Sequence, residues 1–189
     1  MGKIKLFVDF DNTIVDSTKA ICDMYNNHFK DKEGFVLANP TKCMEWDFSD
    51  VCTLANKETL EEYFNTKEFF KNLNIFYFAR RTIKTLSDYC DIYIVSIGDF
   101  KNLSYKSEFI ERELPFIKNL ILIRNENCNM DKSIVDMSDG ILIDDNPHNL
   151  ISSNAKNKIL FGRDYNYNKG FDFERLYTWS QVYDRLCVN

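Results

Sequence analysis

The sequence lacks three features that would each assign the protein to a class. It has no run of five or more lysines and arginines, and its formal net charge is −5. Nothing in it therefore provides the basic surface that binds a nucleic-acid duplex. No stretch approaches the roughly 18 consecutive apolar residues of a membrane-spanning helix. We expect neither a duplex nor a membrane as a partner.

The cysteines also lack a pattern. They lie at positions 22, 43, 52, 90, 128 and 187, with no Cys-x-x-Cys pair and no short regular spacing. Neither a zinc site nor a disulfide framework is therefore indicated. Only three consecutive apolar residues, 6–8, precede Asp9, which is too few for the core of a signal peptide. We expect reduced thiols in a cytoplasmic protein.

The composition is that of a globular domain. Hydrophobic residues make up 44% and charged residues 28%, which is far from the composition of a disordered chain. The 189 residues suit one domain with a modest insertion. Helical spacing of apolar residues appears at 82–89 and 103–114, and Pro147 favours a further helix start. Short apolar runs predict buried parallel strands at 4–8, 92–95, 120–123, 141–143 and 158–161.

This alternation predicts an α/β sheet with crossover helices. The interval 17–80 is the exception, because it separates the first two predicted strands and contains no strong strand. Ala20, Ile21, Met24 and Tyr25 recur there at helical spacing. We expect a core formed by 1–16 and 81–189, with a helical cap at 17–80 that covers the active site as a lid.

Polar side chains follow several predicted strands. In open α/β sheets, ligands bind beyond the carboxyl ends of the strands, so residues far apart in sequence converge there. The candidates are Asp9 and Asp11 after the first strand, Ser96 after the second, Asp144 and Asp145 after the fourth, and Lys132 between the third and fourth.

These side chains suit phosphoryl transfer, which needs an in-line nucleophile, a proton donor and positive charge. Asp9 is able to attack phosphorus and form an aspartyl-phosphate. Asp11 is placed to protonate the leaving oxygen and then to deprotonate the attacking water, which is worth typically 10²–10⁴-fold. Lys132 would offset charge on Asp9 and the phosphoryl group, and Ser96 would donate a hydrogen bond to it.

The acidic residues indicate a metal, because packed carboxylates repel one another unless a cation neutralises them. Ligands that are all oxygen and leave room for a phosphate favour Mg²⁺. Each residue also has a plainer interpretation. An Asp-x-Asp at a strand end is often a turn or helix cap, and a lone lysine is usually solvated. Their joint order favours the catalytic interpretation.

Four motifs, in order, resemble those of the haloacid dehalogenase-like phosphatase superfamily. They are Phe7-Val8-Asp9-Phe10-Asp11-Asn12-Thr13, Ile92-Tyr93-Ile94-Val95-Ser96, Lys132, and Ile141-Leu142-Ile143-Asp144-Asp145. The resemblance implies a Rossmann-like sheet in the order 5-4-1-2-3. It also implies these roles: Asp9 as nucleophile and metal ligand, Asp11 as acid/base with its backbone carbonyl on Mg²⁺, Ser96 and Lys132 on the phosphoryl group, Asp145 as direct ligand and Asp144 as ligand through water.

The predicted cap resembles that of the 5′(3′)-deoxyribonucleotidases. Trp46-Asp47 falls where that family places a tryptophan over the nucleobase, and Phe69-Phe70 where a phenylalanine lines the same pocket. Considered singly, these aromatic residues are also candidates for cap core. The stretches Ser104-Tyr105-Lys106-Ser107-Glu108-Phe109-Ile110 and Asp131-Lys132-Ser133-Ile134-Val135 resemble the family as well.

The second motif departs from the family. It continues as Ser96-Ile97-Gly98-Asp99, where the family more usually has Ser/Thr-Ser/Thr-Pro, and Asp99 brings a negative charge near the phosphate. The loop between Arg124 and Lys132 is longer than typical. Lys101 is a candidate to replace a basic substrate-binding residue of the relatives.

The leading hypothesis is Mg²⁺-dependent hydrolysis of a nucleoside monophosphate, with 5′(3′)-deoxyribonucleotides favoured. An alternative keeps the chemistry but takes a small non-nucleotide phosphate ester. A third is a phosphate-binding regulator without turnover, which the pairing of Asp9 with Asp11 disfavours. The sequence leaves open the base, the sugar, the position cleaved and whether the protein is a homodimer.

Overall fold

The protein is built on a six-stranded sheet in which every neighbouring pair of strands is parallel. The computed structural model describes residues 3–125 and 130–187. The strands are β1 (Ile4–Val8), β2 (Cys90–Gly98), β3 (Asn119–Arg124), β4 (Gly140–Asp144), β5 (Asn157–Phe161) and β6 (Glu174–Leu176), in the order β3-β2-β1-β4-β5-β6. The predicted Rossmann-like α/β class is confirmed.

The predicted order 5-4-1-2-3 is that of the first five strands and is incomplete, because β6 lies beside β5 at the edge. β6 has three residues, and two of them are charged. It therefore carries no apolar run from which a strand could be predicted.

Alternate residues of the strands enter two cores, one on each face of the sheet. Leu6 and Val8 of β1 belong to one core and Phe7 to the other. Successive side chains of a strand point to opposite faces, so an almost continuous apolar run indicates burial on both. The helices α4 (Ala79–Leu86), α5 (Phe100–Glu113) and α7 (Trp179–Cys187) cover the first face, and α6 (Pro147–Ser152), which packs against η2 (Lys132–Ile134), covers the second.

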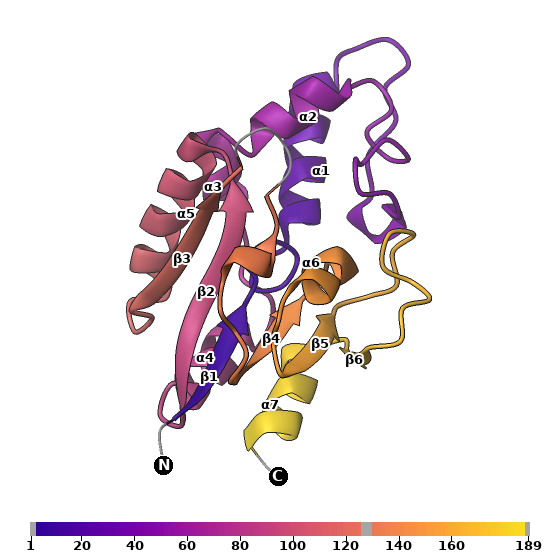
Figure 1. The fold of residues 1–189 in the computed structure, drawn as a ribbon. Helices are drawn as coiled ribbons and strands as arrows, with labels where there is room; N and C mark the ends of the chain where they lie inside the picture. The colour runs from indigo at the N-terminus through magenta and orange to yellow at the C-terminus, as the bar shows by residue number, and fades with distance from the viewer. Residues whose placement is uncertain (1–2, 126–129, 188–189) are drawn as a thin grey trace.

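The helices of the predicted cap follow β1. They are α1 (Ser17–Phe29), η1 (Pro40–Lys42), α2 (Lys57–Tyr63) and α3 (Lys67–Asn72), and α1 packs against the other three. α1 and α2 lie beyond the carboxyl ends of the strands, whereas the two chain termini lie at the opposite end of the sheet (Figure 1). The predicted boundary at residues 80 and 81 falls inside α4, so the division into core and cap stays a prediction.

Two further predictions concern the chain as a whole. Among the described residues, no helix is long and apolar enough to cross a membrane. The described cysteines, at positions 22, 43, 52, 90 and 187, are free thiols, and Cys128 lies outside the described residues.

Candidate active site

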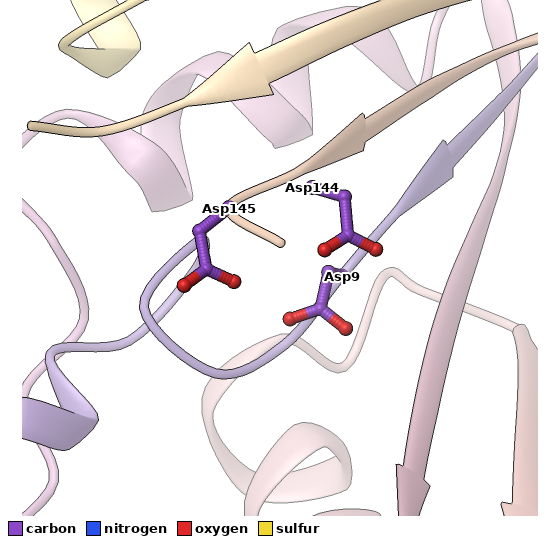
Figure 2. Close-up of side chains that lie close together, drawn as sticks. All are labelled: Asp9, Asp144 and Asp145. Atoms are coloured by element: carbon purple, nitrogen blue, oxygen red, sulfur yellow. The ribbon is translucent and has the colours of Figure 1, made fainter. Parts of the chain in front are cut away.

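Three carboxylates meet at the ends of β1 and β4. Parallel pairing sets Val8 opposite Ile143, and the backbone N–H of Asp9 donates to the Ile143 carbonyl at 2.9 Å. This register places Asp9 beside Asp144 and Asp145. One oxygen from each of the three side chains lies within 4.8 Å of the others (Figure 2). All three residues are buried. The predicted convergence of strand ends is therefore present.

Lys132 lies inside this cluster. It is fully buried, and its Nζ donates to Asp9 Oδ1 at 2.6 Å and to Asp144 Oδ2 at 2.5 Å. Burial acts to lower the pKa of Lys132, but the two carboxylates outweigh it and raise the pKa above its ordinary value. The lysine therefore stays charged. If all groups are ionised, three carboxylates and one ammonium leave an excess negative charge.

Burial and the excess negative charge raise the pKa values of two of the carboxyl groups. Burial, followed by repulsion from neighbouring carboxylates, raises the pKa of Asp9 to about 7 despite the attraction of Lys132. Burial and the charge of Asp9 also raise the pKa of Asp145 well above its ordinary value. A cation among these oxygens would remove the repulsion, and clustered hard oxygen ligands suit a divalent metal. The residues present fit the predicted metal site.

The side chains of Asp144 and Asp145 accept hydrogen bonds from residues outside the cluster. Asp144 Oδ1 accepts from the Asn146 backbone at 2.9 Å and from Asn149 Nδ2 at 3.2 Å, so both of its oxygens are engaged. Asp145 Oδ2 accepts from the Tyr167 hydroxyl at 2.6 Å. Ligand carboxylates are typically oriented by such outer contacts.

Asp11 has different partners. Its Oδ1 accepts from Ser17 Oγ at 2.7 Å and its Oδ2 from Lys106 Nζ at 2.5 Å. Asn12, with φ of 49°, turns the chain, and its side-chain oxygen accepts from the Thr18 backbone at 3.0 Å. The turn thus leads directly into α1 and brings Ser17 to the carboxylate. Because its oxygens are engaged elsewhere, the Asp11 side chain is set apart from the cluster of three.

Ser96 ends the buried part of β2 and is 1% exposed. Its hydroxyl oxygen accepts from Lys106 Nζ at 2.8 Å. Because Lys106 also contacts Asp11, Ser96 and the Asp11 carboxylate share one partner. The structure therefore connects Asp9 with Lys132, and Asp11 with Ser96.

Trp46 is connected to this site by the ring of Tyr167, which lies between Trp46 and Asp145. Its side chain is 56% exposed and meets the Tyr167 ring edge-on, with centroids 5.0 Å apart. Tyr167 in turn donates to Asp145 and stacks on Tyr165 at 5.0 Å. The Trp46 ring is therefore largely exposed beside the tyrosine that contacts Asp145.

Phe69 and Phe70 are placed differently. They are 0% and 6% exposed, and their rings pack on each other at 5.1 Å. Phe69 also contacts Phe64, and Phe70 contacts Tyr105 of α5. Neither ring presents a face to solvent, and the contacts are those of a hydrophobic core.

Lys101 lies at the start of α5 and lines an open cavity of about 600 Å³. Its described lining includes Asp99 and Arg124 but none of the three clustered carboxylates. The glycine at position 98, where the second motif departs from the family, leaves room for a neighbouring side chain. A Cβ at Gly98 would lie 2.3 Å from Asn102 Oδ1. The long loop before Lys132 lies partly outside the described residues.

Comparison with known proteins decides the family. The model described as 5′ nucleotidase, deoxy (Pyrimidine), cytosolic type C protein matches residues 3–189. A 5′(3′)-deoxyribonucleotidase of Clostridium acetobutylicum is 31% identical over 190 residues, which cover 99% of this chain and 96% of that protein. The chain belongs to this deoxyribonucleotidase family. A second 5′(3′)-deoxyribonucleotidase, of Bacillus subtilis, is 30% identical over 63% of this chain and 66% of its own.

The fold of this chain is similar to those of solved haloacid dehalogenase-like proteins. A predicted phosphatase from Clostridium acetobutylicum has a TM-score of 0.66 at 14% identity, with each chain covered completely. The HAD-hydrolase YfnB of Bacillus subtilis, solved with bound magnesium, has a TM-score of 0.62 at 15% identity over 99% of this chain and 100% of its own. At these identities the likeness shows the fold alone.

Two polar side chains of this deoxyribonucleotidase family member were missed as site residues by the sequence analysis. Lys106 shares the buried face of α5 with Leu103, Phe109 and Ile110, at helical spacing. A lysine on an apolar face was a usable signal, because an unpaired ammonium is rarely buried. Tyr167 lies in an irregular loop, where no periodic signal existed.

Proposed function

We propose that the protein is a Mg²⁺-dependent phosphatase that hydrolyses deoxyribonucleoside monophosphates through an aspartyl-phosphate on Asp9. The observation that carries this proposal is the buried cluster of Asp9, Asp144, Asp145 and Lys132 in a chain of the deoxyribonucleotidase family. The two relatives described above are 5′(3′)-deoxyribonucleotidases, which supports the substrate class.

Asp9 would act as the nucleophile. The bond from Lys132 fixes Asp9 Oδ1 and offsets its charge, which lowers the repulsion between the carboxylate and an incoming phosphate. Attack forms the bond from an Asp9 oxygen to phosphorus, while the bond from phosphorus to the nucleoside oxygen breaks. Mg²⁺, held by Asp9, Asp145, the Asp11 carbonyl and Asp144 through water, would supply positive charge for the phosphoryl oxygens.

Asp11 would then handle the protons. It gives one to the departing nucleoside oxygen and takes one from the water that releases phosphate from Asp9. Ser96 and Lys132 would donate hydrogen bonds to the phosphoryl group. This assignment leaves Asp9 free of any proton-transfer duty and agrees with the separate environments of the two carboxylates.

The substrate contacts belong to the same proposal. Trp46 would stack on the nucleobase, since aromatic stacking is worth roughly 1–3 kcal/mol per base. Lys101 remains the proposed phosphate-side cation, and residues 17–80 the proposed cap. Phe69 and Phe70 would then support the pocket from within the cap. The family description as cytosolic supports the prediction of a cytoplasmic enzyme.

The proposal is tested by assaying the 5′- and 3′-monophosphates of the pyrimidine and purine deoxyribonucleosides, with sugar phosphates alongside, in Mg²⁺ and in EDTA. We expect the deoxyribonucleotides to be preferred and EDTA to abolish turnover. Asp9→Asn should lower kcat by at least about 1,000-fold, because the amide is a poor nucleophile. Equal rates on all esters would refute the nucleotidase assignment, and an active Asp9→Asn variant would refute the mechanism.

A further inference from the structure

Lys106 is a buried cation that the mechanism above does not use. It is 1% exposed, although it sits in the middle of α5. Its Nζ lies 5.5 Å from the centroid of the Phe10 ring. The Phe10 ring packs edge-to-face on the Phe109 ring, with centroids 5.7 Å apart. Burying an ammonium in such a place is strongly unfavourable unless it is paired and fully hydrogen-bonded.

Its three N–H groups have three acceptors. These are Asp11 Oδ2 at 2.5 Å, Ser96 Oγ at 2.8 Å and the Ile97 carbonyl at 3.3 Å. An ammonium has no further donors, so the side chain is saturated by the site. The geometry ties α5 to the end of β2 and to the turn after β1. Lys106 therefore does for Asp11 and Ser96 what Lys132 does for Asp9 and Asp144.

The contact with Ser96 has a directional consequence. Because Ser96 Oγ accepts from Lys106, the hydroxyl proton of Ser96 points away from the ammonium and is available to a phosphoryl oxygen. The contact with Asp11 acts together with that from Ser17, since the two donors take different oxygens of the carboxylate. The plane of the Asp11 carboxylate is thereby set from both sides.

We infer that Lys106 is a positioning residue for catalysis, which holds the Asp11 carboxylate at the leaving group. The inference rests on the proposed function, because it assigns Lys106 a part in that reaction. Its consequence is selective. Loss of Lys106 harms esters whose leaving oxygen needs a proton and spares esters whose leaving group departs as a stable anion.

The test compares the deoxyribonucleotide turned over fastest by wild type with p-nitrophenyl phosphate, whose leaving group needs no proton. The quantity compared is kcat/KM, which reports the steps up to formation of the aspartyl-phosphate. We expect Lys106→Met to lower kcat/KM at least about 100-fold for the nucleotide, in the range of lost acid–base assistance, and less than about 10-fold for p-nitrophenyl phosphate. Lys106→Arg should restore part of the loss.

A second readout follows the next step. In Lys106→Met, attack by Asp9 on p-nitrophenyl phosphate persists while the attack of water is slowed, so rapid mixing should show a burst of p-nitrophenolate. In the double variant with Asp11→Asn, kcat/KM for the nucleotide should fall no further than in Asp11→Asn alone, because Lys106 acts through Asp11. Lys106→Met alone leaves the Asp11 carboxylate without its ammonium, whereas the double variant removes both charges, so it tests the inference even if Lys106→Met alone does not fold.

Lys84→Met is the matched control, because Lys84 is exposed on α4, and it should behave as wild type. Equal losses on both esters, or additive losses in the double variant, would show that Lys106 only stabilises the fold and would overturn the inference alone. Wild-type protein that hydrolysed neither ester would overturn the proposed function and the inference together.

Discussion

At the scale of single residues, the site is defined by charges that do not cancel. Lys132 contacts two of the three clustered carboxylates, and Asp145 is left with the hydroxyl of Tyr167. A neutral donor offsets less charge than an ammonium, which explains why burial and repulsion raise the pKa of Asp145 so far. The raised pKa values mean that these carboxylates bind protons readily. Protons and Mg²⁺ therefore compete for the same carboxylate oxygens.

This competition predicts a pH dependence of Mg²⁺ binding. The pKa of Asp9 is raised to about 7 in the folded protein, so its contribution to stability is fully present below the unfolded value of 3.8. That contribution is lost as pH rises through about 7. Mg²⁺ should thus stabilise the protein more at pH 8 than at pH 5.5. At 100 times Kd the gain is about 2.7 kcal/mol, or about 5–10 °C in Tm.

Thermal unfolding with MgCl₂ and with EDTA at the two pH values measures this effect. Asp145→Asn is the control, because it removes one candidate ligand and should reduce the Tm increase at pH 8. A Tm increase of the same size at both pH values would contradict the assignment of these carboxylates as the metal site.

At the scale of elements, two distant loops bind each other beside the site. The Arg163 guanidinium donates to the carbonyls of Pro40 and Cys43, the latter at 2.8 Å, and the Asn166 backbone donates to the Met44 carbonyl at 2.9 Å. These bonds hold the loop that carries Trp46 against the loop that carries Tyr167. The two loops lie next to each other in the fold (Figure 1).

Trp46→Ala should therefore change substrate affinity and leave the chemistry intact. We expect KM for a deoxyribonucleotide to rise about 10-fold, which corresponds to about 1.4 kcal/mol and lies within the range for one stacked base. The kcat/KM for p-nitrophenyl phosphate should stay within about twofold of wild type. Trp46→Phe should retain part of the nucleotide affinity. Unchanged KM in Trp46→Ala would remove Trp46 from the binding site.

At the scale of the whole molecule, helix α7 is connected to the turn that follows Asp11. Trp179 of α7 is 1% exposed and its Nε1 donates to the Thr13 carbonyl at 2.7 Å. Thr82 of α4 donates to the Trp179 carbonyl at 3.2 Å, and the Trp179 ring lies 5.6 Å from that of Phe161. The turn that follows Asp11 is thus supported from the opposite end of the chain.

Trp179→Phe should destabilise the protein by about 1–3 kcal/mol, because it leaves the buried Thr13 carbonyl without its donor and removes part of a packed ring. Urea unfolding measures the change in free energy. Tyr183→Phe on the same helix is the control, because Tyr183 is 37% exposed and should be close to neutral. A Trp179→Phe variant as stable as wild type would show that the bond from Trp179 does not support the turn.

The elements also show where prediction from sequence reached its limit. Strands β1 to β5 were each predicted, although β2 extends to Cys90–Gly98 where 92–95 had been predicted. Polar residues at the ends of β2 escape an apolar pattern but still pair with β1 and β3. β6 was missed because it has neither length nor an apolar run.

The sequence by itself determined which chemistry the site supports. Asp9, Ser96 and Asp144 each end or follow an apolar run, and parallel strands must present their carboxyl ends at one edge. The local sequence patterns were therefore enough to predict that these residues lie close together. Tertiary structure decided what holds them: Lys106 reaches Asp11 across 95 positions and Tyr167 reaches Asp145 across 22. Such contacts depend on how helices and loops pack on the sheet, and no local spacing encodes that packing.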